Sequence, residues 1–456
     1  MKNYLENFQK DFIFVPTDKA SNNISIVCKK FYVKTLLKEV GFFDLDRKQD
    51  RTYQEIKLTS EEIINLHEKE NQTFGVTIDN KQYHLPLLLW IPKMHKNPSK
   101  QRFIAASHCC TTKNLSSLVS KSLKLIQKAH QVYCERIKNY SGYNLFWIVD
   151  NSLSVHKILK QCDTKAKNLA TYDFSTLYTS IPHKKLKIQI SWVIEKAFKG
   201  MNKKYIKINK FCARWSNKKD RNPDVIFVDS DTLIKMIAWL IDNTYVRIGD
   251  KVFRQVIGIP MGTDCAPFLA NLFLFSYEFQ WMYEKLKRKQ FYLLNKFKHC
   301  CRYIDDLFAI NNNKTLLRLK HKIYPPELDI TTDDENDHNV HYLDLDILIK
   351  NDKFSFCIYD KRDKFNFPIV NFPNLSGNIP TSHSYSVFLS QLVRYARGCL
   401  YFEDFQKRTN SLIIKLLKQN FRLHRLEKVY KKFCSRYKHL LHRYGKAVFD
   451  WTGLCR

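Results

Sequence analysis

Two segments far apart in the chain place aspartates beside apolar, strand-forming residues, and they constrain the fold more than any other feature. The first, Thr171–Tyr178, contains Asp173, and the second, Arg302–Leu307, contains Asp305 and Asp306. Carboxylates at the rim of a buried sheet are costly unless a cation compensates them. If the two segments form neighbouring strands, Asp173 and Asp305 are suited to hold two Mg²⁺ ions about 4 Å apart, since Mg²⁺ prefers one or two carboxylates plus phosphate oxygens.

An Asp-Asp pair also has a plainer interpretation, because aspartate is common in polar turns. The acidic run at residues 333–337 is best interpreted in that way, as a solvated loop. The motifs that accompany the pair at residues 305 and 306 therefore decide between a turn and a metal site.

The charge of the chain predicts a polyanionic partner. Its 456 residues include 76 Lys and Arg against 44 Asp and Glu, a formal net charge of +32. Contacts to phosphate release counterions and contribute much of the affinity for nucleic acids. The alternative is a generally basic protein with no such partner.

Cysteine spacing and apolar runs predict a protein inside the cell that neither crosses a membrane nor is secreted. None of the 13 cysteines forms a Cys-x-x-Cys pair, which argues against a zinc ribbon or a redox motif. The early apolar run Phe12–Val15 is too short for a signal peptide, and the later runs have the size of core elements.

Apolar periodicity predicts a mixture of helices and antiparallel hairpins. Helical spacing is found over residues 114–138, 267–283 and 426–444, and residues 199–224 read as a basic, irregular insertion. Strands and hairpins are predicted for the following ranges: 24–27, 85–107, 169–174, 246–253, 299–311, 342–349 and 354–359.

Four motifs in a fixed order resemble the reverse transcriptases. Tyr303–Asp306 is similar to their Tyr-x-Asp-Asp signature, and Asp173 with its flanks to their first catalytic motif. Gly258–Asn271 resembles the loop and helix under the template and incoming base. Leu89–Lys96 and Arg102–Ile104 resemble two motifs of the fingers that hold the triphosphate.

Within that superfamily the chain most resembles the Penelope-like retroelements, which are relatives of telomerase. The amino-acid sequences of three segments, Pro92–Lys96, Leu177–His183 and Ser390–Arg397, support this subgroup. The resemblance covers roughly residues 85–400. Such elements often carry a GIY-YIG endonuclease, and nothing similar to it occurs up to Arg456. The resemblance therefore implies a Penelope-like reverse transcriptase without that endonuclease.

The resemblance implies an α+β fold, a right-hand polymerase with fingers, a ferredoxin-like palm and a helical thumb. The predicted division is an N-terminal extension over 1–85, fingers over 86–165, a palm over 166–350 with a basic insertion at 199–230, and primer grip plus thumb over 351–456. Basic residues on the other faces of the C-terminal helices fit a thumb that tracks a duplex, although a merely solvated face is the alternative.

The resemblance also assigns roles to individual residues. Tyr178 corresponds to a steric gate that excludes a 2′-hydroxyl, although it could simply pack the start of a helix. Lys93 and Arg102 could likewise be ordinary solvated cations. Gly262 could be an ordinary turn glycine. The implied sets are Asp173, Asp305 and Asp306 for catalysis; Asp173, Asp305 and the Phe174 carbonyl for metal; Lys93, Arg102, Tyr178, Met261 and Gly262 for substrate; and Tyr359 and Lys361 for the primer grip.

The function implied is RNA-directed DNA synthesis with two Mg²⁺ ions, or Mn²⁺, as cofactors. The implied partners are an RNA template, a DNA primer and deoxynucleoside triphosphates, and the implied location is the nucleus or otherwise the cytoplasm. Two alternatives stay open: a catalytically inactive nucleic-acid-binding remnant, and a telomerase-like or RNA-synthesising polymerase.

Overall fold

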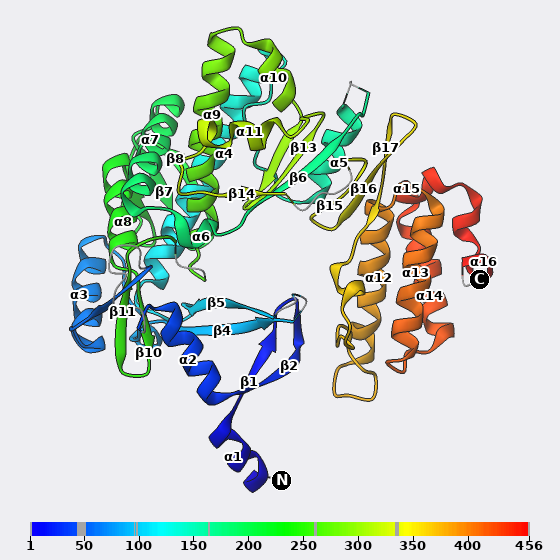
Figure 1. The fold of residues 1–456 in the computed structure, drawn as a ribbon, viewed down its shortest axis with the longest axis horizontal. Coiled ribbons are helices and arrows are strands. Elements are labelled where there is room, and N and C mark those ends of the chain that lie inside the picture. The colour runs from blue at the N-terminus through cyan, green and yellow to red at the C-terminus, as the bar shows by residue number, and fades with distance from the viewer. Residues whose placement is uncertain are drawn as a thin grey trace.

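The sheet that carries both aspartate segments is antiparallel and lies in the upper middle of Figure 1. The structure, a computed structural model, describes residues 2–42, 52–94, 96, 99–162, 165–259, 262–332 and 337–454. The predicted hairpin forms, and its second strand begins at Asp306 itself. In spatial order this palm sheet consists of β12 (Cys300–Tyr303), β13 (Asp306–Ile310), β6 (Leu169–Phe174) and β14 (Ile330–Thr331).

The palm sheet is buried on both faces because its strands alternate between two hydrophobic cores. On β13, Leu307 and Ala309 belong to one core, and Phe308 and Ile310 to the other. The first core is closed by α4 (Lys113–Ser141), α7 (His183–Met201), α8 (Ser230–Asp242), α9 (Ala266–Lys287), α10 (Phe291–Phe297) and α11 (Thr315–Ile323).

Helix α9 is the most deeply buried of these helices. Four successive residues from Leu272 to Phe275 are inaccessible to solvent, so the helix is apolar all round and not amphipathic. The predicted helices over 114–138 and 267–283 are confirmed, each slightly longer than predicted.

A second, five-stranded sheet, the fingers sheet, is assembled from three distant parts of the sequence. Its strand order is β3 (Tyr53–Ile56), β11 (Lys251–Gln255), β10 (Tyr245–Ile248), β4 (Leu87–Lys93) and β5 (Lys100–Ala106). The sheet therefore includes one strand from the predicted N-terminal extension and two from the predicted palm. Local sequence patterns identify these strands but not their long-range pairing, which explains why the predicted division at residues 85 and 166 does not describe this sheet.

The N-terminal residues form α1 (Lys2–Asp11), the hairpin β1 (Phe12–Thr17) and β2 (Ala20–Cys28), α2 (Lys29–Glu39) and α3 (Ser60–Thr73). Side chains of β1, α2 and α3 pack against the fingers sheet, whereas α1 extends away from it (Figure 1). Tyr32 on α2 stacks on Trp90 of β4 with ring centroids 4.7 Å apart, and the Trp90 indole N–H donates to the Tyr32 carbonyl at 3.0 Å. This contact anchors the N-terminal segment beside the strands that carry Lys93 and Arg102.

The predicted irregular insertion is instead a small antiparallel sheet. Its strands β8 (Ala213–Ser216), β7 (Tyr205–Ile208) and β9 (Ile226–Val228) bury Ile206, Ile208 and Val228 against the first core. The alternation of apolar and polar residues in these strands is at most four residues long and lies among lysines. It is therefore too short to predict the strands from the sequence.

The predicted boundary at residue 350 falls inside a further, three-stranded sheet. Strands β15 (Asn339–Tyr342), β16 (Leu345–Lys350) and β17 (Lys353–Ile358) pair continuously across it, which corrects both that boundary and the single strand predicted for 342–349. Helix α5 (Ser152–Gln161) and the C-terminal helices complete the second core together with this sheet.

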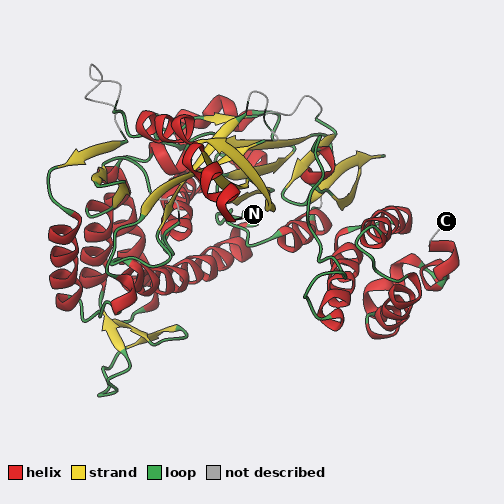
Figure 2. Ribbon diagram, turned by 90° about the horizontal axis from the view of Figure 1, so that it is seen from below, coloured by secondary structure: helices red, strands yellow, loops and turns green. Residues whose placement is uncertain are grey.

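The C-terminal helices form a group at one end of the molecule (Figure 2). The helix predicted over 426–444 is interrupted at Tyr437, where the backbone leaves helical geometry, so the tail folds back on itself instead of continuing straight. The group consists of α12 (Thr381–Gly398), α13 (Phe402–Leu417), α14 (Leu423–Arg436), α15 (Lys438–Leu441) and α16 (Trp451–Leu454). Across the described ranges, no helix has both the length and the apolar character needed to cross a bilayer.

Candidate active site

The fold brings the three predicted aspartates together at one end of the palm sheet. Asp306 and Asp173 are direct register partners on the antiparallel strands β13 and β6, and Asp305 occupies the turn that precedes β13. Register partners in such a ladder have Cα atoms about 5 Å apart. The Phe174 N–H donates to the Asp305 carbonyl at 3.2 Å, which ties the turn to the end of β6.

The turn that contains Asp305 is strained, and hydrogen bonds from side chains outside the turn support it. Ile304 has φ of 57°, a left-handed conformation that β-branched residues avoid. The Arg302 guanidinium donates to the Ile304 carbonyl at 2.8 Å, and the Tyr342 hydroxyl donates to the Asp306 carbonyl at 3.1 Å. The position of the aspartates is therefore determined by side chains on both faces of the sheet as well as by the ladder.

A fully buried ion pair supplies this support. Arg302 and Glu278 are inaccessible to solvent and form two bonds, with Nε to Oε1 at 2.6 Å and Nη2 to Oε2 at 3.1 Å. Tyr324 donates to the same carboxylate at 2.9 Å, and the carbonyl and side-chain oxygens of Asn271 accept from the guanidinium. Glu278 is not among the predicted site residues, although a lone acid within the apolar run at residues 267–283 is a usable signal.

The three carboxylates repel one another in a partly buried space. Burial raises the pKa of Asp306 to about 7, and the charges of Asp305 and Asp173 add to the effect. Burial also raises the pKa of Asp305, whereas Arg102, Arg302 and Lys19 act in the opposite direction. Uncompensated negative charge of this kind favours a bound cation.

The donor set suits Mg²⁺ bound jointly by protein and substrate. In the part of the chain that the structure describes, no three His, Cys, Asp or Glu side chains are grouped so that they could hold a metal ion by themselves. Mg²⁺ commonly takes one or two carboxylates and completes its shell with water and phosphate oxygens, and Asp173 and Asp305 offer carboxylates of that kind. The Phe174 backbone pairs with Ile330, and a metal role for its carbonyl stays a prediction.

Tyr178 lies beside these carboxylates, at the start of α6 (Leu177–Ser180). Burial raises the pKa of its phenol, with a further contribution from the charge of Asp305. The Tyr178 carbonyl accepts from the Ile259 N–H at 2.7 Å. A Cβ on Gly258, where φ is 91°, would lie 2.3 Å from that same carbonyl oxygen, so only glycine allows this approach.

Gly262 is required by the fingers sheet itself. Its φ is 112°, and a Cβ there would lie 2.3 Å from the Ala105 carbonyl oxygen at the end of β5. The predicted approach of Gly262 to the nascent base pair stays a prediction. Met261, the neighbouring substrate residue in the sequence analysis, lies outside the described residues.

The two predicted triphosphate-binding cations lie on neighbouring strands of the fingers sheet. Ile91 and Arg102 are register partners, and Lys93 pairs with Lys100 two residues further along. Burial, together with the charge of Arg102, lowers the pKa of Lys93. Arg102 pairs at 3.0 Å with Asp18, an N-terminal residue that no sequence motif points to.

The two predicted primer-grip residues are found just after β17. Tyr359 stacks on His341 with ring centroids 4.0 Å apart and an interplanar angle of 6°. Lys361 begins the short helix η2 (Lys361–Lys364), and its pKa is lowered by burial and by the charges of Lys19 and Lys96, whereas Asp306 acts in the opposite direction. The charges of Lys361 and Asp306 thus act on each other, while the primer contact of Tyr359 and Lys361 stays a prediction.

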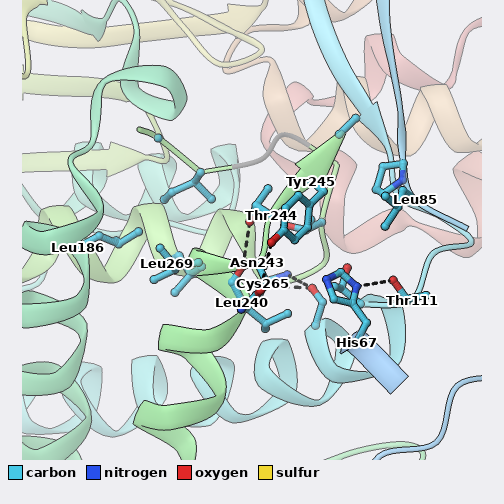
Figure 3. A pocket seen from close by; sticks show the side chains of 18 residues that line it. His67, Leu85, Thr111, Leu186, Leu240, Asn243, Thr244, Tyr245, Cys265 and Leu269 are labelled. Carbon is cyan, nitrogen blue, oxygen red and sulfur yellow. Dashed lines mark hydrogen bonds between the residues drawn. The ribbon is translucent and has the colours of Figure 1, made fainter. Parts of the chain in front are cut away.

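Gly258 and Ile259 also line a small cavity, which Figure 3 shows from close by. His67 lines it, and its Nδ1 is 2.7 Å from the Thr111 hydroxyl oxygen. Burial lowers the pKa of His67 to about 4, so the imidazole is neutral. The cavity measures about 30 Å³, room for roughly two water molecules, which excludes a nucleotide.

No protein-family model and no curated protein matches the sequence. Among solved structures, telomerase from Candida albicans in complex with a TWJ fragment of telomeric RNA is similar, with a TM-score of 0.58 and 12% identity over 99% of this chain and 70% of that chain. Apo telomerase from Candida tropicalis gives a TM-score of 0.48 and 12% identity over 97% and 73%. The first similarity confirms the predicted α+β, right-hand polymerase fold.

Proposed function

We propose that this chain is an RNA-directed DNA polymerase that adds deoxynucleotides to the 3′ end of a primer. One observation carries the proposal: Asp173 and Asp306 are cross-strand partners, with Asp305 in the adjoining turn, at one end of the palm sheet. Lys93 and Arg102 lie on the fingers sheet nearby, and the charge of Arg102 acts on Asp305. Carboxylates for metal and cations for triphosphate are the two halves of a nucleotidyl-transfer site.

The reaction proposed here joins the primer 3′-oxygen to the α-phosphorus and breaks the α–β phosphoanhydride bond, with release of pyrophosphate. Held by Asp173 and Asp305, two Mg²⁺ ions or Mn²⁺ ions would activate the hydroxyl and neutralise the leaving group. Lys93 and Arg102 would bind the triphosphate, Arg102 through its planar fork of donors. Asp306, with its raised pKa, would share the local charge with Asp305.

Tyr178 supports the choice of deoxynucleotides. The ring is half-buried and lies against the first core, and its backbone is fixed by the Ile259 N–H. A ring held in this way leaves little room for a 2′-hydroxyl beside the reacting sugar. This argument favours DNA synthesis over RNA synthesis.

The proposed partners are an RNA template and a DNA primer. The net charge of +32 and the exposed basic residues of the C-terminal helices support a duplex partner. The sequence stretches Pro92–Lys96, Leu177–His183 and Ser390–Arg397 support an origin in the Penelope-like group of retroelements. A nuclear location belongs to this proposal, and imaging of the tagged chain in cells would test it.

Primer extension on an RNA template tests the proposed reaction. The purified chain receives an annealed DNA primer, Mg²⁺, and either deoxynucleotides or ribonucleotides. We expect extension by deoxynucleotides that Asp305→Asn abolishes. Asp224→Asn, which makes the same change at an exposed residue of the small three-stranded insertion, should leave extension intact.

Each other outcome selects an alternative. Extension by ribonucleotides alone would assign the chain to the RNA-synthesising polymerases and contradict the gate role of Tyr178. No extension, together with tight and salt-sensitive binding of the duplex, would indicate an inactive nucleic-acid-binding protein.

A further inference from the structure

A cavity larger than the one beside Gly258 lies where α5 meets the C-terminal helices α12 and α15 (Figure 1). Its volume is about 520 Å³, and small-molecule sites occupy about 300–1,000 Å³. Its lining residues belong to none of the predicted catalytic, metal, substrate or primer-grip sets. The cavity is therefore a candidate site separate from the palm aspartates.

The lining of this cavity carries positive charge from three separate elements. Lys157 and Lys160 come from α5, Arg397 from the end of α12, and Arg443 from the short helix η3 (His442–Tyr444). Among the described residues, the lining includes no Asp or Glu, and none of these four side chains forms an ion pair with an acid. The cations of the cavity thus have no anion of their own.

Arg443 is held at the cavity by the last turn of α12. Its guanidinium donates through Nη2 to the Ala396 carbonyl, one of the helix-end carbonyls that lack a partner within the helix. The guanidinium carbon also lies 4.9 Å from the centre of the Tyr444 ring, and the Tyr444 hydroxyl donates to the Cys399 carbonyl at 2.7 Å. These contacts place Arg443 beside Arg397 and leave its Nε and Nη1 without a partner among the described residues.

A buried imidazole in the lining also lacks a hydrogen bond. His156 is 8% exposed and stacks on Phe356 of β17 with ring centroids 4.4 Å apart. Its Nε2 is inaccessible to solvent and has no hydrogen-bond partner among the described residues. Burial lowers the pKa of His156 to about 4, and the charges of Lys160 and Arg443 add to the effect, so the imidazole is neutral. A buried polar group of this kind calls for a water or a ligand that completes its hydrogen bonding.

The acid whose charge acts on His156 is already paired elsewhere. This acid is Asp344, and its carboxylate accepts two hydrogen bonds from Arg394, at 3.0 Å and 3.1 Å. It therefore does not neutralise the cations of the cavity, which repel one another unless an anion lies between them. A phosphate monoester carries about −1.5 to −2 charges near neutral pH, and Lys and Arg are its usual partners.

We propose that this cavity binds a compact small molecule that carries several phosphate groups. Lys157 and Lys160 bind it from α5, and Arg397 and Arg443 bind it from the C-terminal helices. A nucleic-acid strand fits less well, because its phosphates follow one another along an extended backbone, whereas these cations converge on one cavity. The inference goes beyond the proposed polymerase reaction and does not depend on it.

Calorimetric titration with myo-inositol hexakisphosphate tests the cavity, in EDTA and at physiological ionic strength, which screens scattered surface charge. Lys160 and Arg397 are exposed, so replacing both by glutamine should leave the fold intact. We expect Kd to rise about tenfold for each charge-assisted hydrogen bond that is lost. The matched control replaces Lys184 and Lys199 of α7 by glutamine, removes the same charge and should keep Kd unchanged.

Thermal unfolding gives a second measurement on the same three proteins. Without ligand, the cavity variant should unfold at the same or a slightly higher temperature than the unaltered chain, because repulsion between its cations is reduced. The hexakisphosphate should raise the unfolding temperature of the unaltered chain and of the α7 control, and raise that of the cavity variant less. Equal increases in all three proteins would contradict the proposal.

A single-stranded RNA oligonucleotide, titrated into the same proteins, identifies the source of the phosphate. If the cavity variant loses affinity for RNA but keeps its Kd for the hexakisphosphate, nucleic acid occupies the cavity and the proposal is wrong. Equal losses of hexakisphosphate affinity in the cavity and α7 variants would indicate general attraction to a basic chain, which also overturns it. No titration requires primer extension, so these outcomes are decided separately from the proposed function.

Discussion

Asp306 couples the stability of the chain to pH. Its pKa is about 7 in the folded chain and about 4 when unfolded, so between these values the folded state holds a proton that the unfolded state releases. The contribution of Asp306 to stability is therefore fully present below about pH 4 and is lost as the pH rises through 7. We expect the unaltered, metal-free chain to lose more stability between pH 5 and pH 8 than Asp306→Asn does.

Urea unfolding in EDTA at both pH values measures this difference. Asp224→Asn, at an exposed position, should behave like the unaltered chain. Added Mg²⁺ should reduce the difference, because a bound cation lowers the pKa of neighbouring carboxyls. Equal pH dependence in all three proteins would contradict the raised pKa.

The contributions of Arg302 and Glu278 to the free energy of unfolding should depend strongly on each other. Arg302→Met leaves a buried carboxylate to which, of the residues that the structure describes, Tyr324 alone donates a hydrogen bond. We expect this variant to lower the free energy of unfolding by about 3–5 kcal/mol. Arg302→Met combined with Glu278→Leu should recover much of that loss, since no charge remains buried. Urea titration of the single and double variants measures the coupling, and additive losses would contradict it.

At the scale of residues, local motifs predicted which side chains lie together, and the roles of these side chains stay predictions. Asp173, Asp305, Asp306 and Tyr178 are brought together by strands and turns that the sequence also predicts. The contact of Asp18 with Arg102 was not predicted, because it depends on how the hairpin docks on the fingers sheet. No pattern within residues 12–28 encodes that contact.

At the scale of elements, the loop of Gly258 and Ile259 holds the α6 turn in position. Gly258→Ala adds a clash with the Tyr178 carbonyl to the cost of its positive φ. Gly142 has a similar φ of 77° but open space around its Cβ position, so Gly142→Ala isolates the backbone cost, about 1 kcal/mol. We expect Gly258→Ala to cost about 1–3 kcal/mol more than this control.

Thermal or urea unfolding of the two glycine variants measures the difference. Gly258→Ala should also displace Tyr178, so its discrimination between deoxynucleotides and ribonucleotides should fall, while Gly142→Ala keeps it. Equal costs and equal discrimination would show that the loop does not fix the gate.

Elements with strong local periodicity were predicted well, and short ones were not. Helices α4 and α9 extend over more than five turns, and their apolar residues repeat often enough to be recognised. Strands β7, β8 and β9 have at most four residues, and β14 has two. Their existence depends on pairing with distant partners, which a pattern within one segment cannot show.

At the scale of the whole molecule, the basic C-terminal helices should contribute to the salt dependence of duplex binding. Arg425, Lys428 and Lys432 are exposed on α14. Replacing all three by glutamine should reduce the slope of log Kd against log salt by about 0.9 for each phosphate that the variant no longer neutralises. A triple glutamine variant at Lys184, Lys196 and Lys199 of α7, with the same charge change, is the control.

Fluorescence anisotropy of a labelled RNA–DNA duplex over a range of salt concentrations gives these slopes. A smaller slope in the α14 variant alone would support the thumb hypothesis. Equal slopes in the two variants would mean that net charge, and not the C-terminal helices, determines the effect.

The fingers sheet also has a consequence for how the chain is made. Ile56 on β3 pairs with Val252 on β11, about 200 residues later, and the strand order interleaves early and late segments. A ribosome that adds roughly 5–20 residues per second leaves β3 without its neighbour for about 10–40 s. During that interval the apolar side of β4 and β5 has no completed sheet to join. The nascent chain should therefore depend on chaperones until residue 255 has left the exit tunnel.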